Sequence, residues 1–569
     1  MRSERLLVWD RETDPPSAEA LRWRSFGGDC VPAYVEANAE RLRAKYLAFV
    51  HDVSQIKIAG KKVLDHLAIE DGFSVWWMTR LAEKSPYKSP GIYNALRLLA
   101  LEEILRERKP AGVELDSGDD DLAEAVVGLC ASLDIPCVIA MGEGRARPLR
   151  DFVPLPIRGA LAFARYVIAR RPLRHRGKSV WSSSGEAVFF CSFSLGRNSI
   201  SHYWGGLAQR LQSAGRPTNW IHHFLPGQTS PSDDFGVGHH AFLDTYLSVG
   251  VIVRALRRWL RLNFVSWRLR TLPIGWMWPV HRDDWRTSLA GPVGAVHCLW
   301  LELFDSALAD LPRQSIGLYL CENQAWEPAL LRAWRKHGHG QIVGVAHATV
   351  PFWHLYYIDD PRDAATRPAP DRLAVNGPAA ARMLAGAGYP MERIVEVEAL
   401  RYLNIPAPRP RSEAAKKVLI LGDVLPQSMH ALLSTLEGAI ALVPKEYQFT
   451  LKPHPLYTVD LSAFPGLRLQ TTTDGIEKIL EDFDLALAAN GTSAAVDAYL
   501  AGLTVIVGLN GAELNLSPLR GDPDVRFVGT AAEMANALLS APRPKIDNFF
   551  HLDAEMPRWR RLLKLGVND

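Results

Sequence analysis

The sequence has few cysteines, no long apolar run and little net charge, and each shortage argues against a class of protein. The six cysteines are scattered and form no CxxC pair, so we expect reduced core residues and no disulfide or zinc framework. No apolar run is long enough to span a bilayer, and the opening "MRSERLLVWDRETDPP" lacks the apolar core of a signal peptide. A net charge of +3 does not indicate nucleic-acid binding. We therefore expect a cytoplasmic protein.

Apolar runs that alternate with helical patterns are what the sequence has in abundance. The chain of 569 residues, 48% hydrophobic and 22% charged, is long enough for two or three domains. The predicted strands before residue 400 are 5–10, 112–117, 136–140, 186–194, 315–323, 340–347 and 371–377. Helical or loop segments separate them, and Asp119 to Asp121 give one helix an acidic start. This alternation predicts parallel sheets flanked by helices.

A basic, proline-rich stretch, "NIPAPRPRSEAAKK", interrupts the alternation and indicates an interdomain linker. The pattern then restarts with predicted strands at 417–423, 447–455, 467–472, 483–490, 504–509 and 524–529. We expect an N-terminal region over 1–400, with a subdivision near 150–185 left open. A linker over 401–416, a second domain over 417–545 and a helical tail over 546–569 follow.

One predicted strand ends in an unusual turn, "YQFTLKPHP", in which His454 lies between Pro453 and Pro455. Proline fixes its own φ and biases the preceding residue toward extended geometry, so the turn is stiff. The histidine is either part of a rigid turn or is held toward a ligand. Lys452 precedes it directly.

A second strand, "FDLALAAN", is followed by Asn490, Gly491, Thr492 and Ser493 and then by a helix. Gly491 permits a tight turn, and Thr492 or Ser493 can cap the helix. Free amides at such a turn also suit an anion. Because ligands of open α/β sheets sit outside the carboxyl ends of strands, His454 and this turn can meet at one edge. The pairing favours a nucleotide phosphate site over two unrelated turns.

In the N-terminal region, acids and a histidine follow two predicted buried strands. Glu322 ends the strand 315–323, and Glu327 begins the next helix. A positioned carboxylate can be the general base for a sugar hydroxyl in an inverting route or the nucleophile in a retaining double displacement, and the sequence leaves both open. An acid at a helix start can instead simply stabilise that helix. The pattern favours the catalytic role for Glu322 and the helix-start role for Glu327. His347 ends the next strand; it either assists Glu322, binds the acceptor, or is a partly buried histidine with structural bonds only.

A polar loop follows the strand 186–194 and reads "SLGRNSISHYWGG". Its candidate ligand-binding residues are Arg197, Asn198, His202 and Tyr203, and the sequence does not rank them. An ordinary connection explains a glycine-containing loop equally simply. Neither Asp119 to Asp121 nor Asp359-Asp360 has the character of a metal-binding DxD site, so we expect no metal and no cofactor.

The "KPHP" strand end and the "NGTSAAVDAYLAG" segment resemble GT-B glycosyltransferases, and more narrowly bacterial enzymes that use CMP-activated acidic sugars, the Kdo transferases and several sialyltransferase families. The resemblance covers roughly the last third of the chain. It implies two Rossmann-like domains whose parallel sheets face a central cleft. It also implies that His454, Pro455, Thr492 and Ser493 bind the CMP phosphate and nucleotide.

Three N-terminal segments, "WWMTRLAEKSPYKSPGIYNALRLLALEEIL", "YLCENQAWEPALLRAWRKHG" and "GVAHATVPFWHLYY", resemble an uncharacterised family of surface-carbohydrate biosynthesis proteins. This similarity implies the pathway and not the reaction. Together the two resemblances imply an enzyme that transfers Kdo or a nonulosonate to a surface-polysaccharide acceptor. The open alternatives are a UDP- or GDP-hexose transferase, a polymerase-like transferase using CDP-alcohols, and a non-catalytic scaffold of polysaccharide assembly.

Two segments interleave arginine with leucine and aromatic residues: "IRGALAFARYVIARRPLRHRGK" and "VRALRRWLRLNFVSWRLRTLPIGWMWP". Basic amphipathic segments can lie in the interface of an anionic bilayer. Arginine stems can instead cover apolar surface on ordinary helices. No nucleic-acid fold motif accompanies them, so we expect no nucleic-acid partner. The pattern favours peripheral attachment to the inner face of the plasma membrane.

Overall fold

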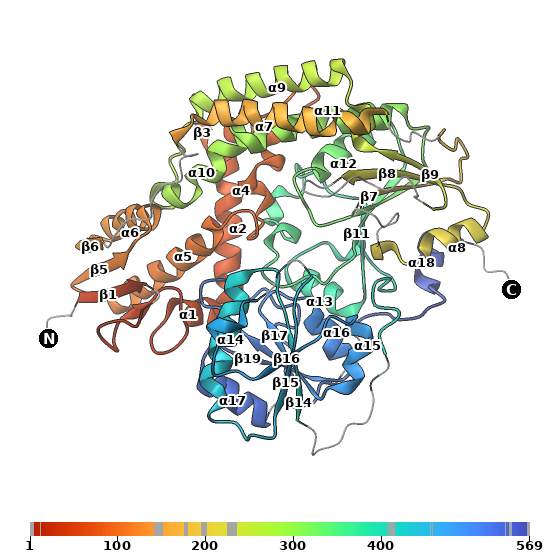
Figure 1. Ribbon diagram of the computed structural model, residues 1–569. Helices are drawn as coiled ribbons and strands as arrows, with labels where there is room; N and C mark the ends of the chain where they lie inside the picture. The colour runs from red at the N-terminus through yellow and green to blue at the C-terminus, as the bar shows by residue number, and fades with distance from the viewer. Residues whose placement is uncertain are drawn as a thin grey trace.

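The computed structural model describes residues 5–11, 13–141, 152–175, 180–194, 202–224, 236–406, 408, 416–455, 457, 459–540, 542–545 and 549–565. Its longer strands form three parallel sheets (Figure 1), and a short antiparallel hairpin joins β3 (Lys57–Ile58) to β4 (Lys61–Lys62). The predicted α/β class with parallel sheets is confirmed.

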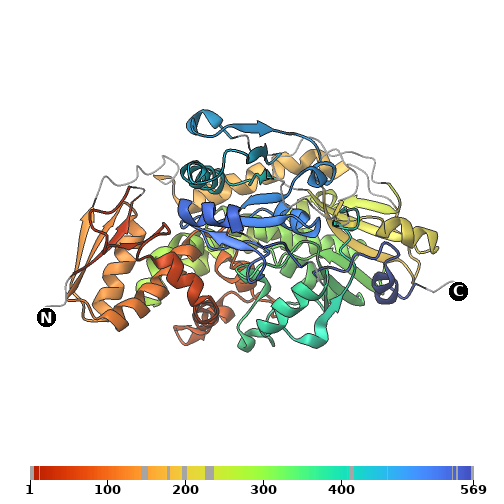
Figure 2. The same cartoon turned by 90° about the horizontal axis from the view of Figure 1, so that it is seen from below.

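The first sheet has four strands, in the order β2 (Leu21–Arg22), β1 (Arg5–Asp10), β5 (Gly112–Ser117) and β6 (Cys137–Met141). Helix α6 (Asp120–Ser132) links β5 to β6, and the Asp119 carboxylate caps it by accepting from the amide of Leu122 at 3.1 Å. The predicted order of strand, acidic helix start, helix and strand is therefore confirmed. Figure 2 shows this sheet beside the N-terminus, at the opposite end of the molecule from the C-terminus.

The second sheet has seven strands and contains every strand predicted between residues 186 and 377. Its order is β13 (Ile394–Glu396), β12 (Arg372–Val375), β11 (Gln341–Ala346), β10 (Ile316–Leu320), β7 (Val188–Ser194), β8 (Thr218–Phe224) and β9 (His239–Phe242). The sequence alternation did not reveal β8, β9 or β13, nor that these strands form a sheet separate from the first.

Helices surround the first two sheets. They are α1 (Val31–Ala37), α2 (Ala39–Gln55), α3 (Val63–His66), α4 (Arg80–Glu83), α5 (Gly91–Arg108), α7 (Leu155–Arg170), α8 (Leu207–Ser213), α9 (Val249–Arg268), α10 (Trp278–Leu289), α11 (Pro292–Asp310), α12 (Glu327–Lys336) and α13 (Pro378–Gly386). One continuous hydrophobic core joins the two sheets and their helices. Within the described ranges, no helix combines the length and apolar character needed to cross a membrane.

The third sheet has six strands, in the order β16 (Leu469–Thr471), β15 (Gln448–Lys452), β14 (Lys417–Leu421), β17 (Leu485–Ala489), β18 (Thr504–Gly508) and β19 (Arg526–Val528). Its helices are α14 (Pro426–Ile440), α15 (Ile476–Ile479), α16 (Ala494–Leu500) and α17 (Ala531–Ser540). Alternate residues of β14 enter two different cores, Val418 and Ile420 in one and Leu419 and Leu421 in the other. The sheet is therefore covered on both faces, as parallel sheets usually are.

The end of the chain returns to the second sheet. Helix α18 (Pro557–Leu562) lies in the segment 546–569, where the sequence predicted a helical tail. The Glu398 carboxylate accepts from the amides of Arg558 and Trp559, each at 3.1 Å, and the Trp559 indole donates to the Glu398 carbonyl at 2.9 Å. The chain thus crosses between the second and third sheets twice. It passes to the third sheet before β14 and returns to the second sheet after α17.

Candidate functional site

Three turns lie together at the carboxyl edge of the third sheet, because β15, β14 and β17 are neighbours in it. They contain His454, Gly422 and Gly491. The Gly422 amide donates to the Lys452 carbonyl at 2.9 Å. A side chain at Gly422 would lie 2.5 Å from the backbone nitrogen of His454, so only glycine fits there. The turn that holds His454 follows β15 and the turn 490–493 follows β17, so the single strand β14 lies between them.

An acid that the sequence did not single out holds the turn 490–493 in place. Asp423 is only 4% exposed and follows β14. Its carboxylate accepts from the amide of Leu425 at 3.1 Å and from that of Gly491 at 3.2 Å. The sequence pattern indicated that the amides of this turn are free to bind an anion. The Gly491 amide, however, already donates to a protein carboxylate. A phosphate at this edge needs donors from elsewhere.

The remaining predicted nucleotide residues divide into buried and outward-facing ones. Asn490 is buried, and its amide donates to the Leu514 carbonyl at 2.5 Å, which fixes the loop after β18. Thr492 is buried as well, whereas Ser493 and His454 are half-buried and Pro455 is exposed. The Lys452 ammonium donates to the Asp474 carbonyl at 2.6 Å. Of this set, Lys452, His454 and Ser493 are the polar residues that retain contact with solvent.

At the carboxyl edge of the second sheet, two glutamates have different surroundings. Glu327 is 1% exposed, and its Oε1 accepts from the amides of Glu322 at 2.8 Å and Gln324 at 2.9 Å. Burial raises the pKa of the Glu327 carboxyl to about 8. Glu322, whose side chain is 32% exposed, is presented by the turn that Glu327 holds. Glu327 thus occupies the helix-start position that the sequence pattern favoured for it.

His347 and Tyr203 complete this edge. The Nε2 atom of His347 lies 3.4 Å from Oε1 of Glu322, and the His347 and Tyr203 ring centroids are 4.2 Å apart. Tyr203 therefore joins the group from the loop that follows β7. Arg197 and Asn198 lie outside the described residues, and His202 begins a short 3-10 helix over His202–Trp204.

Arg401 links the two sheet edges. It lies in the segment that leaves the second sheet, and its guanidinium donates to the Ser493 hydroxyl at 3.3 Å. Burial raises the pKa of Asp497 to about 6, and the positive charge of Arg401 opposes that rise. Burial also raises the pKa of Tyr203, which Arg401 lowers and Glu322 raises as charged neighbours. One cation therefore lies between the Glu322 group and the turn 490–493.

The connection between α4 and α5 brings two further residues, Tyr87 and Lys88, to the carboxyl edge of the second sheet. Lys88 donates to Glu83, and the same Glu83 carboxylate accepts from the amide of Ala325 at 3.2 Å, which fastens the connection to the turn after β10. Tyr87 is 48% exposed, and its hydroxyl lies 3.2 Å from Nε2 of His354. Partial desolvation, and then the carboxylates of Asp423, Glu513 and Glu322, raise the pKa of its phenol. Tyr87 thus lies near acids of both sheets.

We call the set formed by Glu322, His347, Tyr203, Tyr87, Arg401, Asp423 and Ser493 the junction site. In Figure 1 the third sheet lies below the second. Glu322, His347, Asp423 and Ser493 follow strands of these two sheets, whereas Tyr87 comes from the α4–α5 connection and Arg401 from the segment between the sheets. The part of the chain that the structure describes contains no group of three or more histidine, cysteine or acidic side chains placed to hold a metal ion.

Sequence reasoning missed Asp423, Arg401 and Tyr87. Asp423 follows a predicted strand in the same way as Glu322, and that position was the available signal. Tyr87 lies in "KSPYKSP", where prolines stiffen the chain as they do around His454. Arg401 begins the predicted linker, and no local pattern marks a linker residue as part of a site.

Comparisons with known proteins give partial structural similarity alone. No protein-family model matches the chain, and no curated protein matches it. Among solved structures, it is similar to CalG4, the calicheamicin glycosyltransferase, with 14% identity and a TM-score of 0.35 over 67% of this chain and 93% of that one.

Two further solved structures show similarity of the same order. UDP-GlcNAc 2-epimerase from Methanocaldococcus jannaschii matches at 10% identity and a TM-score of 0.39, over 67% of this chain and 100% of that one. MurG from Acinetobacter baumannii matches at 11% identity and a TM-score of 0.34, over 67% of this chain and 98% of that one. An activity for this chain therefore has to be argued from its own residues.

Proposed function

We propose that this protein is a metal-independent glycosyltransferase of the GT-B type, which transfers a sugar from a nucleotide donor to a glycan acceptor. One observation carries the proposal: Arg401 donates to Ser493 at the edge of the third sheet, and it is also a charged neighbour of Tyr203, whose ring contacts His347 at the edge of the second sheet. Ligands of open α/β sheets bind outside the carboxyl ends of the strands. A substrate at the junction site therefore contacts both edges, with its phosphate toward one and its reacting sugar toward the other.

Within this proposal the donor is a CMP-activated acidic sugar, Kdo or a nonulosonate, and the acceptor is a surface polysaccharide or its lipid-linked precursor. The His-Pro strand end and the Asn-Gly-Thr-Ser turn support the CMP assignment through the resemblance they carry. Arg401 supports an acidic ligand, because a guanidinium matches the geometry of phosphate and carboxylate groups. Since Asp423 occupies the Gly491 amide, the phosphate donors in this proposal are Arg401, Ser493 and His454.

The acceptor hydroxyl gives its proton to Glu322 in the reaction that we propose. The half-exposed carboxylate is held by a turn, which reduces its freedom, and His347 lies 3.4 Å from it. The acceptor oxygen attacks the anomeric carbon as the bond from that carbon to the phosphate oxygen breaks. The electron pair of that bond leaves with the nucleotide, whose phosphate charge Arg401 stabilises.

The test is release of CMP from CMP-Kdo and CMP-sialic acid with water in place of the unknown acceptor. The wild-type protein should release CMP from at least one of them. Glu322→Gln should slow release by about 10²–10⁴, the usual contribution of a positioned acid or base. Glu446→Gln is the matched control, because Glu446 is paired with Lys416 at the amino end of the third sheet. It should leave the rate unchanged.

The other outcomes identify the alternatives. Faster release of UDP or GDP from a nucleotide hexose would mean that the donor is a UDP- or GDP-hexose and not a CMP sugar. Wild-type turnover in Glu322→Gln would remove this carboxylate from the chemistry. A folded protein that cleaves no nucleotide sugar and binds no nucleotide would indicate a scaffold that has kept the fold.

A further inference from the structure

Helices α7 and α9 expose an apolar stripe that no part of the described chain covers. On α9 the exposed residues are Val249, Val253, Leu256, Leu260, Phe264 and Trp267. Successive members are three or four residues apart, so they lie on one face of the helix. On α7, Leu161 is four residues after Ile157, and Ile168 is seven residues, about two turns, after Leu161, so these three also lie on one face. These two helices and the two residues before α7, Phe152 and Val153, hold 11 of the 20 exposed large hydrophobic residues in the described ranges.

The core does not explain this stripe, because each helix also has a buried face. Val251, Ala255, Trp259 and Leu262 of α9 are buried. Trp259 stacks on Phe163 of α7, with the ring centroids 6.5 Å apart, so the two helices lie side by side. Figure 1 shows both along the upper edge of the molecule, on the far side of the second sheet from β14 to β19. The two helices are therefore remote from the third sheet, with the second sheet between them.

Charge on the two helices has one sign. Neither α7 nor α9 contains an acidic residue, whereas α7 has three arginines and α9 has five. The arginines of these two helices are therefore a strong local positive charge in a chain whose net charge is only +3. The arginines divide into an inner group with protein partners and an outer group.

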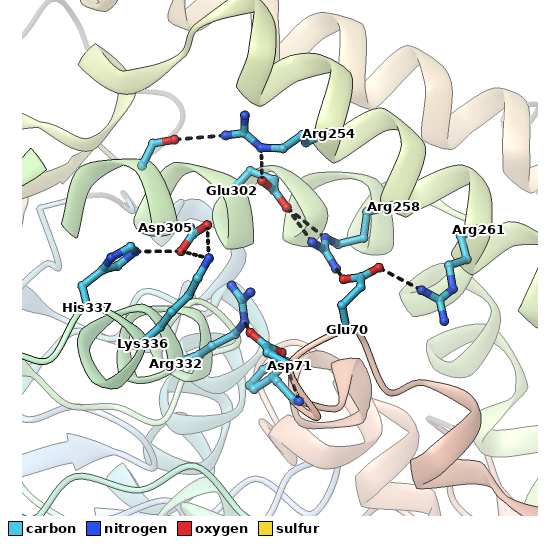
Figure 3. Close-up of polar contacts among 12 residues, drawn as sticks. Glu70, Asp71, Arg254, Arg258, Arg261, Glu302, Asp305, Arg332, Lys336 and His337 are labelled. Atoms are coloured by element: carbon cyan, nitrogen blue, oxygen red, sulfur yellow. Dashed lines mark hydrogen bonds and ion pairs between the residues drawn. The ribbon is translucent and has the colours of Figure 1, made fainter. Parts of the chain in front are cut away.

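The inner group orients α9. Arg254 and Arg258 donate to Glu302 of α11 at 2.7 and 2.8 Å, and Arg258 and Arg261 pair with Glu70 at 3.1 and 2.9 Å (Figure 3). Glu302 is almost fully buried, so these bonds hold one flank of the helix toward the protein. The apolar stripe is fixed outward as a consequence.

The outer group consists of Arg165, Arg171 and Arg257, which are exposed and make no ion pair among the described residues. They lie on the same two helices as the stripe, or directly after α7 in the case of Arg171. Leucine, phenylalanine and tryptophan beside unpaired arginines are the composition of a surface that lies in the interface of an anionic membrane. A purely polyanionic partner would leave the apolar stripe in water.

We propose that the outward face of α7 and α9, which we call the α7–α9 face, docks on an anionic lipid bilayer. This inference is independent of the proposed transfer reaction, because it uses no residue of the junction site. The apolar stripe enters the boundary between headgroups and acyl chains, and the outer arginines contact the anionic headgroups. Docking in this orientation leaves the third sheet remote from the bilayer, with the second sheet between them.

The test is co-sedimentation of the full chain with vesicles of phosphatidylcholine, with or without phosphatidylglycerol. The protein should sediment with the anionic vesicles and be released as salt screens the charges. Arg165→Gln with Arg257→Gln should weaken binding by about fivefold per arginine. Leu260→Gln with Phe264→Gln should weaken it by at least about tenfold, because both side chains leave the interface.

A matched pair controls for general surface hydrophobicity. Leu442, two residues after α14, and Leu539, on α17, are 60% and 55% exposed, against 55% and 61% for Leu260 and Phe264. Leu442→Gln with Leu539→Gln should bind vesicles like the wild-type protein. Thermal unfolding of each variant confirms that it is folded, which is expected because all four positions are exposed.

Three results would overturn the proposal. The first is failure of the wild-type protein to sediment with anionic vesicles at low salt. The second is binding that the arginine pair weakens and the Leu260/Phe264 pair does not, which indicates a soluble polyanion as the partner. The third is a wild-type dimer, detected by analytical ultracentrifugation, that Leu260→Gln with Phe264→Gln converts to monomer without a change in vesicle binding. That result makes the face a contact between two copies of the chain.

Discussion

Glu327→Gln tests whether the buried glutamate is protonated and structural. The amide has the shape of a protonated carboxyl, and its oxygen can still accept from the Glu322 and Gln324 amides. In the wild-type protein, burial raises the pKa of Glu327 from 4.5 to about 8. A difference of about 3.5 units corresponds to roughly 5 kcal/mol at about 1.36 kcal/mol per unit.

The direction of the pH dependence follows from whether the folded or the unfolded protein binds the Glu327 proton more tightly. Because the folded pKa is the higher one, the favourable contribution of Glu327 is complete below pH 4.5 and is lost as the pH rises to about 8. Buried histidines oppose this trend, since burial lowers the pKa of His222 and His297 to about 3. Comparing the variant with the wild type at each pH cancels that opposing contribution.

Urea unfolding at several values between about pH 5 and about pH 8 measures the difference directly. The stability of Glu327→Gln relative to the wild type should rise with pH, with a slope approaching about 1.4 kcal/mol per pH unit. A difference that stays constant over this range would refute the buried, protonated carboxyl. The same variant should keep most of its CMP release, in contrast to Glu322→Gln, because Glu327 acts on the turn and not on the substrate.

The remaining predictions concern the junction site and the neighbouring His454. Arg401→Gln should weaken CMP binding by about 1.5–3 kcal/mol and Arg401→Lys by less, because lysine keeps the charge and loses the planar fork; equal losses in a titration would mean that the charge alone contributes nothing to CMP binding. His454→Ala should weaken CMP binding by about 1.5–3 kcal/mol, and unchanged affinity in a folded variant would leave His454 as part of a rigid turn. His347→Ala should slow CMP release less than Glu322→Gln, because it orients the carboxylate; an equal loss would give His347 a direct part in the reaction.

The parallel sheets were predictable because the signals that specify them are local. Short apolar runs such as 417–423 and 483–490 alternate with helical patterns, and each became a strand of the expected sheet. The division of the N-terminal region into two sheets was not predictable in this way. Which strands pair with one another depends on contacts between segments that are distant in the sequence. The residues of β8 and β9 also lack a local pattern that would have marked them as strands.

The candidate site could be predicted from the sequence to the extent that its residues lie at strand ends. Glu322, His347 and Ser493 follow buried strands, and sequence position alone was enough to select them. The role of the Gly491 amide depended on Asp423, which is 68 residues away in the chain. Arg401 likewise becomes a site residue only because the chain crosses between sheets there. Such long-range pairs have no counterpart in local sequence pattern.

Calorimetric titration of the wild-type protein with CMP, and with UDP and GDP in parallel, tests most directly whether the junction site binds a nucleotide sugar. The proposed function predicts that CMP binds most tightly and that Arg401→Gln weakens this binding. Tighter binding of UDP or GDP would contradict the CMP donor. If the folded protein binds none of the three nucleotides, the proposal that it is a nucleotide-sugar transferase is wrong.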